Sequence, residues 1–461
     1  MTLATGNPPT SAPAATGAGA VAQHPGPPAA RRPRTDRRLG RTRVVLAVGA
    51  LLFGAAGIIS TQIRADGADD VKSHSGVLIQ QAEQLYHDLS DADATSATIY
   101  LHVGEAPKEL LQRYDDDLKG AQSTMLAATN EAGSDRAAKD ALDRIAQQLP
   151  IYAKLNATAA ANNLVGYPVG IRYLTQASNL MQGTILPQAQ KLTDAEAKNL
   201  SAAEDTATQF PWPMIAVGAL MLGGLIVIQV RESRRTNRVF SIGLLAATAA
   251  LALSLMWAAA ATSIQSSHVD QAKKKGSNQV SVLATARILS LQARTDEMLT
   301  LVARGTADDK ETDFSGSTDA ANNHTPGTEE KLAAALQSAG QIATDGTGRD
   351  LAGAAADDVD QWSKQHKMLR DLDAQNQYQK AVDSALGERD YVAPAPSAAL
   401  SFGKLQADLD KAIAHAEDAF RSEAASGADA LTGLEIGLGV LAVAMAAAVV
   451  VGLGRRLAEY H

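Results

Sequence analysis

The chain lacks cysteine entirely and contains few aromatic residues. No cysteine occurs among its 461 residues, which excludes disulfide bonds, zinc–thiolate sites and a catalytic thiol. Aromatic side chains make up only 4% of the sequence, whereas alanine is abundant. Because alanine favours helices and aromatic residues favour strands, this composition predicts an all-α protein built from long helices.

The sequence also lacks the motifs of common enzymes. It has no glycine-rich phosphate loop, no histidine pair at the helical spacing of a metal site and no nucleophile elbow. The acidic run at 114–120 (YDDDLKG) is typical of a solvated helix face. The net charge of −8 gives no general nucleic-acid footprint. We therefore expect no enzymatic activity, no cofactor, no metal site and no nucleic-acid partner.

Four long apolar runs are the most prominent feature of the sequence. They lie at 44–63, 212–230, 239–261 and 434–453. A helix needs roughly 20 mostly apolar residues to cross the hydrocarbon core of a bilayer, so the runs predict four transmembrane helices. The alternative is four buried helices of a large soluble protein. The first run is longer than the apolar region of a cleaved signal peptide, and we expect it to be an uncleaved anchor.

Basic residues are distributed unequally about these spans. Thirteen Lys and Arg residues fall in segments 1–43, 231–238 and 454–461, against seven near the opposite ends of the spans. Because basic loops stay on the cytoplasmic side, we predict a multi-pass cell-membrane protein with both termini in the cytoplasm. Segment 1–43, which is Pro- and Gly-rich at first and then basic, is predicted to be a disordered cytoplasmic tail. Segments 64–211 and 262–433 are then predicted to be extracytoplasmic.

Both extracytoplasmic segments carry helical heptad patterns. Apolar residues from Leu78 to Val103 recur at spacings of four and three, and a similar seam runs from Ala284 to Val302. Each seam is followed by three further helical stretches: 109–132, 135–163 and 169–208, then 328–343, 348–378 and 398–431. We predict two four-helix bundles arranged as a tandem repeat. Seams of this kind are also compatible with a homodimer.

Small residues predict close helix packing inside the membrane. A stripe at steps of four runs along the third span, through Ala246, Ala250, Ser254 and Ala258. Gly433 and Gly437 form a GxxxG pair where the fourth span begins. Small residues let helix backbones approach closely in a lipid environment, so these positions are the predicted packing contacts.

Two arginines of the second bundle are candidates for ligand or partner contact. Arg287 and Arg294 lie seven residues apart beside the second seam. Such a pair could clamp a ligand carboxylate at a domain interface. The alternative is that both arginines form salt bridges between helices of the bundle or across a dimer.

The connector between the second and third spans is strongly basic. Its sequence, RESRRTNR, contains Arg231, Arg234, Arg235 and Arg238, and the C-terminal segment GRRLAEYH adds Arg455 and Arg456. These side chains are expected to hold the hairpin against anionic membrane lipids. Neither segment is long enough for a catalytic domain, so we interpret the same arginines as a docking surface for a separate cytoplasmic protein.

The order of the segments along the chain resembles that of a known family. The order is basic tail, span, helical bundle, span, RESRRTNR, span, second bundle, span and GRRLAEYH, and it is similar to that of GlnX-type actinobacterial membrane transducers. The resemblance implies a place between an extracytoplasmic amino-acid-binding lipoprotein of the GlnH type and the cytoplasmic Ser/Thr kinase PknG. It also implies that the sensed nutrients are aspartate, glutamate and related amino acids.

Two other functions remain open on the sequence. The bundles could bind a small molecule directly, as chemoreceptor-like sensors do. The protein could also be a non-enzymatic scaffold of the cell envelope. A signal transducer that senses through a binding-protein partner is the function we expect.

Overall fold

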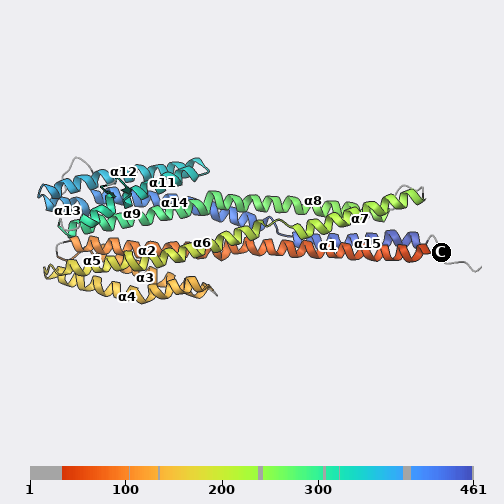
Figure 1. Ribbon diagram of the computed structural model, residues 1–461, viewed down its shortest axis with the longest axis horizontal. Helices are drawn as coiled ribbons and strands as arrows, with labels where there is room; N and C mark the ends of the chain where they lie inside the picture. Colours follow the sequence, from red (N-terminus) through yellow and green to blue (C-terminus); the bar gives the residue numbers. More distant parts are fainter. Residues whose placement is uncertain are drawn as a thin grey trace, which may run out of the picture.

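The computed structural model of the protein describes residues 34–102, 104–132, 135–236, 242–304, 308–320, 322–387 and 396–458. Nearly all of these residues are helical, and the molecule is a long rod (Figure 1). One end is thick and holds two helical bundles, which together we term the head. The other end is thin, and we term it the stem. The predicted all-α fold is confirmed, while the tail at 1–33 lies outside the described residues.

The stem is a bundle of four helices. These are α1 (Arg34–Ser73), α7 (Trp212–Thr236), α8 (Ile242–Gln271) and α15 (Leu434–Ala458). Helices α1 and α8 each pack on both α7 and α15, which closes the ring. Large apolar side chains such as Leu220, Ile242 and Ile436 point outward from the stem. Within the described residues, four helices are long and apolar enough to cross a membrane, as expected for a membrane protein.

The first bundle contains four helical rods. They are α2 (Ser75–Leu101), α3 (Lys108–Glu131), α4 (Arg136–Leu164), and a rod of α5 (Gly170–Leu180), the π-helical segment η1 (Met181–Ile185) and α6 (Leu186–Thr208). The Asp135 carboxylate accepts from two backbone amides in the first turn of α4 and so caps that helix. The core is formed by leucine, isoleucine and alanine side chains together with Tyr152.

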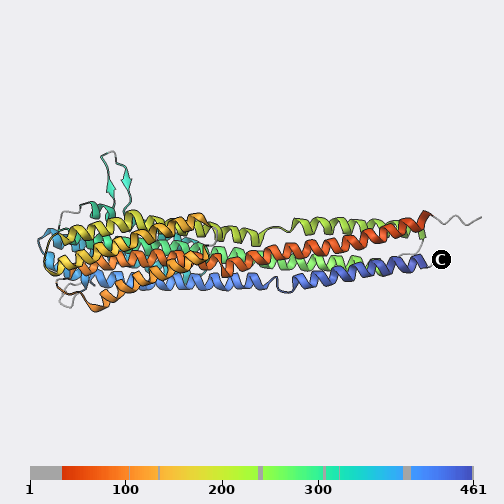
Figure 2. The same cartoon turned by 90° about the horizontal axis from the view of Figure 1, so that it is seen from below.

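The second bundle is built around α9 (Asn278–Val302), which continues from α8 through the π-helical segment η2 (Ala272–Ser277). Its other helices are α10 (Asp308–Ser315), α11 (Thr328–Ile342), α12 (Gly346–Ala374), α13 (Tyr378–Leu386) and α14 (Ala398–Asp429). Strands β1 (Ser317–Thr318) and β2 (His324–Thr325) form a small antiparallel hairpin that projects from the head (Figure 2). The helix predicted over 348–378 is found as α12, which begins two residues earlier and ends four residues sooner, and α13 follows it as a separate short helix.

The two bundles form one head because α2 and α9 pack side by side along its axis (Figure 1). The core of the second bundle includes Ala94, Ala97 and Leu101 of α2, while Ile288 of α9 belongs to the core of the first. The two heptad seams therefore contact each other within one chain. The order of span, bundle and span occurs twice, and the tandem repeat itself stays a prediction.

Candidate functional site

Every helical path from the stem to the head is irregular in the region between them, which we term the neck. The breaks at His74 and η2 lie nearer the head, and those at 209–211 and 430–433 lie nearer the stem. Helix α1 gives way to α2 at His74, and η2 interrupts the path from α8 to α9. The path from α6 to α7 breaks at residues 209–211, and a turn at residues 430–433 separates α14 from α15. Such breaks interrupt the backbone hydrogen-bond ladder and allow packed segments to shift against each other.

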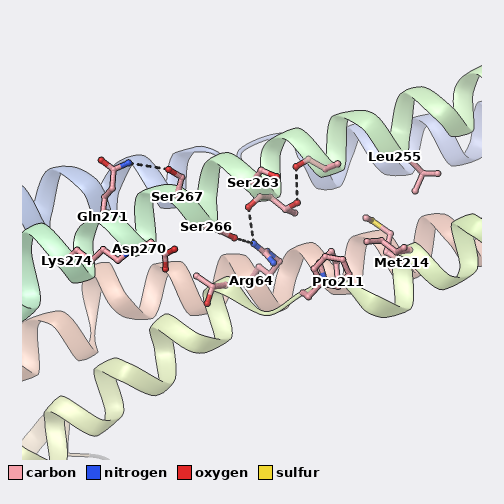
Figure 3. A pocket seen from close by; sticks show the side chains of 15 residues that line it. Arg64, Pro211, Met214, Leu255, Ser263, Ser266, Ser267, Asp270, Gln271 and Lys274 are labelled. Atoms are coloured by element: carbon pink, nitrogen blue, oxygen red, sulfur yellow. Dashed lines mark hydrogen bonds between the residues drawn. The ribbon is translucent and has the colours of Figure 1, made fainter.

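Arg64 of α1 links three of these paths at the neck. Its guanidinium group is only 3% exposed and donates to the Gln209 carbonyl just after α6. It also donates to the Ser266 hydroxyl at 2.8 Å (Figure 3) and to the Gln265 side chain at 2.6 Å, both on α8. The Gln209 carbonyl needs such a donor because Pro211 and Pro213 supply no backbone N–H beyond the break. Arg64 therefore fastens α1, α6 and α8 together.

A pocket of about 680 Å³ opens beside Arg64, between α7 and α8 (Figure 3). On the stem side it is lined by the apolar residues Met214, Ile215, Leu255 and Ala259. On the head side its lining is polar and comes mainly from α8, including Thr262, Ser263, Ser266, Ser267 and Asp270. The pocket is thus amphipathic along the direction that runs from stem to head.

A second cavity, of about 590 Å³, lies inside the first bundle between α2, α3, α4 and α5. Most of its wall is alanine, leucine and isoleucine, with a few polar groups among them. The Asn156 side chain is 7% exposed, and its Oδ1 atom has no hydrogen-bond partner among the described residues. Its Nδ2 atom donates to the Tyr114 hydroxyl at 3.4 Å. A buried acceptor without a partner in an apolar cavity is a candidate contact for a ligand donor.

The charges around this cavity limit what it can bind. Among the described residues that line it there is no Lys, Arg or His, and the charged members are Glu105 and Asp115. Burial raises the pKa of Tyr114 to about 12, so its phenol stays neutral at physiological pH. The cavity therefore suits an uncharged, largely apolar molecule with a hydrogen-bond donor. It offers no cation for a carboxylate.

Arg294 lies in a buried ion network of the second bundle. It donates to Glu297 at 2.5 Å and to the Ala385 carbonyl at 2.6 Å. Glu297 also accepts from the Trp362 indole at 3.3 Å and pairs with His366 at 3.1 Å. Within this network Arg294 is held by internal partners, and it is shielded from solvent.

His366 in the same network stays protonated at neutral pH. Burial by itself would lower the pKa of this imidazole, but hydrogen bonds to Glu297 and Glu311 and the charges of both carboxylates raise it to about 9. The ring also stacks on Phe314 at 3.8 Å between centroids. The network is a structural element of the second bundle, because its groups satisfy each other.

Arg287 does not join Arg294 in a clamp. It pairs with Asp410 of α14 at 3.3 Å, whereas Arg294 pairs within α9. The Arg287 pair is a salt bridge between helices, as the alternative interpretation expects, whereas the Arg294 pair lies within one helix. In the part of the chain that the structure describes, no group of His, Asp and Glu residues is arranged to hold a metal ion.

The predicted docking arginines gather at the far end of the stem. Arg231 and Arg234 are exposed in the last turns of α7, which also contain Arg235. Arg455 and Arg456 lie near the end of α15, and Arg238 falls outside the described residues. The guanidinium of Arg43 in α1 lies beside Gly454 of α15, about 3.5 Å from where a Cβ atom would stand. Basic residues of α1, α7 and α15 thus share one end of the rod.

The structure changes the predicted packing contacts within the stem. Ser254 and Ala258 are fully buried, but Ala250 is half-buried and Ala246 is exposed. The buried face of α8 instead follows Leu244, Ala247, Leu251, Ser254 and Ala258, because a straight helix drifts from a strict four-residue step. Helices α8 and α15 approach each other closely at Gly243, where a Cβ would stand 2.5 Å from Gly452 Cα.

The two glycines of the GxxxG pair have separate roles. Gly433 has a φ of +79° and forms the turn that precedes α15, with no atom near enough to contact a Cβ there. A positive φ favours glycine, so conformation rather than packing explains this residue. Gly437 packs against the indole of Trp257 on α8. Of the two glycines, Gly437 is therefore a packing contact between helices, and Gly433 is not.

Sequence reasoning missed Arg64 and Asn156 as functional candidates. Arg64 was counted only as a flanking charge, although a cation directly after an apolar span needs a buried partner or a route to water. Asn156 stands in an alanine-rich helix (KLNATAAANN), and nothing in that pattern shows which asparagine faces a cavity.

Comparison with known proteins assigns a type to the first bundle. Residues 67–205 match the family model described as the actinobacterial sensor domain. The match runs from the head-side end of α1 into α6 and so covers the first bundle with its cavity. No curated protein matches the chain. The similarity to this domain, together with the apolar stem, supports a membrane-bound sensor protein of the actinobacterial type.

Proposed function

We propose that the protein is a transmembrane signal transducer that relays amino-acid availability from outside the cell to a cytoplasmic Ser/Thr kinase. In this proposal the head is extracytoplasmic and the arginine-rich end of the stem is cytoplasmic, in agreement with the distribution of basic residues. The observation that carries the proposal is the set of helical paths that run from the sensor-like head through the neck to the basic end (Figures 1 and 2).

The charges of the head favour sensing through a partner. Aspartate and glutamate carry two carboxylates and one ammonium group, and proteins hold such carboxylates with Arg, Lys or helix N-termini. The described wall of the first-bundle cavity contains no cation, and Arg287 and Arg294 already have internal partners. An extracytoplasmic amino-acid-binding lipoprotein would supply the missing recognition and dock on the head when loaded.

The neck supplies a physical route for the signal. Arg64 of α1 is hydrogen-bonded to the end of α6 and to α8. A displacement of α6 in the first bundle would therefore move both α1 and α8. Packed helices shift by small steps rather than by continuous deformation, which suits a switch with two states. At the far end the exposed Arg231 and Arg234 would then change their position relative to a docked kinase and to anionic headgroups.

The proposal is tested with the full-length chain in lipid nanodiscs and candidate binding proteins from the same membrane. Glutamate or aspartate alone should leave the melting temperature of the head unchanged. The loaded binding protein should raise it through mass action, whereas the empty binding protein should not. A shift with the amino acid alone would show direct binding and contradict the relay.

The cytoplasmic part of the proposal needs its own test. Crosslinking from intact membranes should recover a Ser/Thr kinase with the wild-type chain. Recovery should fall when Arg231 and Arg234 are both changed to glutamine. The matched control is Lys119→Gln, which removes an exposed charge from the head. Equal recovery of the kinase with the wild-type chain, the double arginine variant and the control would contradict a docking surface at these arginines.

Direct sensing is a second candidate, favoured by the cavity of the first bundle. Its apolar wall and the unpartnered Oδ1 atom of Asn156 suit an uncharged molecule that donates a hydrogen bond. Under this candidate, lipophilic extracts of the growth medium would raise the melting temperature of the wild-type chain but not that of Asn156→Leu. A scaffold protein would respond to neither the extracts nor the binding protein.

A further inference from the structure

The pocket beside Arg64 has the composition of a lipid site. Its stem-side wall is apolar, through Met214, Ile215 and Leu255, and its head-side wall is polar (Figure 3). A phospholipid has the same order of chemistry, with acyl chains below a phosphate and a glycerol. We propose that this pocket binds the phosphate of an anionic phospholipid from the leaflet nearest the head, with an acyl chain entering between α7 and α8.

Arg64 is a buried cation without an anionic partner among the described residues. Among the described residues it donates only to neutral oxygens, namely two carbonyls, the Gln265 amide and the Ser266 hydroxyl. A buried guanidinium group is costly unless an anion balances it. The described lining of the pocket adds the exposed Lys274 and one carboxylate, Asp270, so positive charge predominates. A phosphate fits that excess, because a hydrogen bond from a charged N–H group to a phosphate oxygen is stronger than one between neutral groups.

The aromatic residues beside the pocket place it at the level of the lipid headgroups. Phe210 and Trp212 flank the helix break at the pocket and are both largely exposed, with ring centroids 4.7 Å apart. Exposed aromatic side chains at the end of an apolar span mark the level of the lipid headgroups. Arg64 stands at the same break through its bond to Gln209, so a phosphate at headgroup level lies within its reach.

The packing of the stem helices leaves the apolar wall of the pocket open to the surrounding lipid. Helix α7 packs more closely on α1 than on α8, and the pocket is lined from both α7 and α8. Leu255 is only half-buried and Ala259 is exposed, so the apolar wall is open to the side where lipid would surround the stem. An acyl chain there would bury apolar surface that is otherwise left between two helices.

The test is native mass spectrometry of the full chain released from nanodiscs of equimolar phosphatidylglycerol and phosphatidylcholine. We expect the wild-type chain to retain phosphatidylglycerol in preference. Arg64→Gln should weaken this retention roughly tenfold or more, the usual loss for a hydrogen bond to a charged group. Ser263→Trp should weaken it to a similar extent by filling the exposed wall of the pocket while leaving the bonds of Arg64 in place.

Two matched controls separate the site from general effects. Lys119→Gln removes an exposed charge from the head, and Ala260→Trp adds bulk at an exposed position of α8 that does not line the pocket. Both should retain the lipid as the wild type does. If Arg64→Gln fails to fold, Ser263→Trp decides the matter.

Three results would overturn the inference. The first is undiminished retention in Ser263→Trp. The second is equal retention of phosphatidylcholine and phosphatidylglycerol by the wild type. The third is displacement of the lipid by added inorganic phosphate, which would assign the site to a free anion. None of these results bears on the proposed relay, which depends on the head and the basic end.

Discussion

Replacing Asn156 with leucine should stabilise the head. The change keeps nearly the same volume and removes a buried acceptor that has no partner among the described residues. Leaving such a group unpaired costs about 1–3 kcal/mol, whereas the weak 3.4 Å contact with Tyr114 that is lost contributes ~0.5 kcal/mol or less. The free energy of unfolding of the head should therefore rise by ~1–2 kcal/mol, which corresponds to an increase of roughly 2–6 °C in the melting temperature.

The matched control is Asn163→Leu in the same cavity. Asn163 donates to the Tyr100 carbonyl at 2.9 Å, so its loss should destabilise the head by about 1 kcal/mol. Both variants are compared with the wild-type chain by thermal denaturation in detergent, with circular dichroism as the readout. If Asn156→Leu melts at or below the wild-type temperature, the Oδ1 atom has no energetic cost and the cavity loses its candidate ligand contact.

Three further predictions concern the rest of the molecule. Because the pKa of His366 is raised to about 9, its contribution of ~3 kcal/mol is complete below pH 6.5 and lost as the pH rises through about 9. Thermal melts across that range should show the loss, and His366→Gln should reduce the slope at its upper end, above the raised pKa of about 8 of the Asp117 carboxyl. Arg294→Met should cost about 3–5 kcal/mol in the same assay, because it leaves Glu297 buried without its main cation. Gly243→Leu should separate α8 from α15 and lower the melting temperature of the stem, since its side chain would collide with Gly452.

The arginine and glycine variants each have a matched control in the chain. Arg421→Met removes an exposed pair with Glu417 on α14 and should cost under about 1 kcal/mol. Gly223→Leu places the same side chain on a stem position with no atom within 4 Å of a Cβ. A melting temperature for Arg294→Met equal to that of Arg421→Met would contradict the buried network. A pH slope near pH 9 that is unchanged in His366→Gln would assign the titration to another group.

The apolar runs and the helical periods were sufficient to predict the architecture. Residues 109–132 and 328–343 were expected as helices, and α3 and α11 follow them within a residue. The reason is physical, because a span needs a fixed length and a bundle helix needs a regular apolar face. The heptad seams correctly indicated a packing partner. That partner is the other bundle of the same chain, which a local pattern cannot specify.

The functional candidates were harder to derive, because they depend on contacts between distant segments. Arg64 meets Gln209 and Gln265 across 145 and 201 residues of sequence, and no local spacing predicts such a meeting. The choice between a ligand clamp and internal pairs for Arg287 and Arg294 likewise depended on which helix faces each side chain. The sequence shows that these arginine side chains are charged, but only the packed structure shows which group each of them contacts.

The central claim is that the head lies outside the cell and the basic end of the stem lies inside. Because the chain has no cysteine, single substitutions report their own position with a membrane-impermeant maleimide. Ser123→Cys and Lys411→Cys, at exposed positions of the two bundles, should be labelled in intact cells. Arg234→Cys should be labelled only after the cells are permeabilised. Labelling of Arg234→Cys in intact cells, with Ser123→Cys and Lys411→Cys protected, would contradict the account.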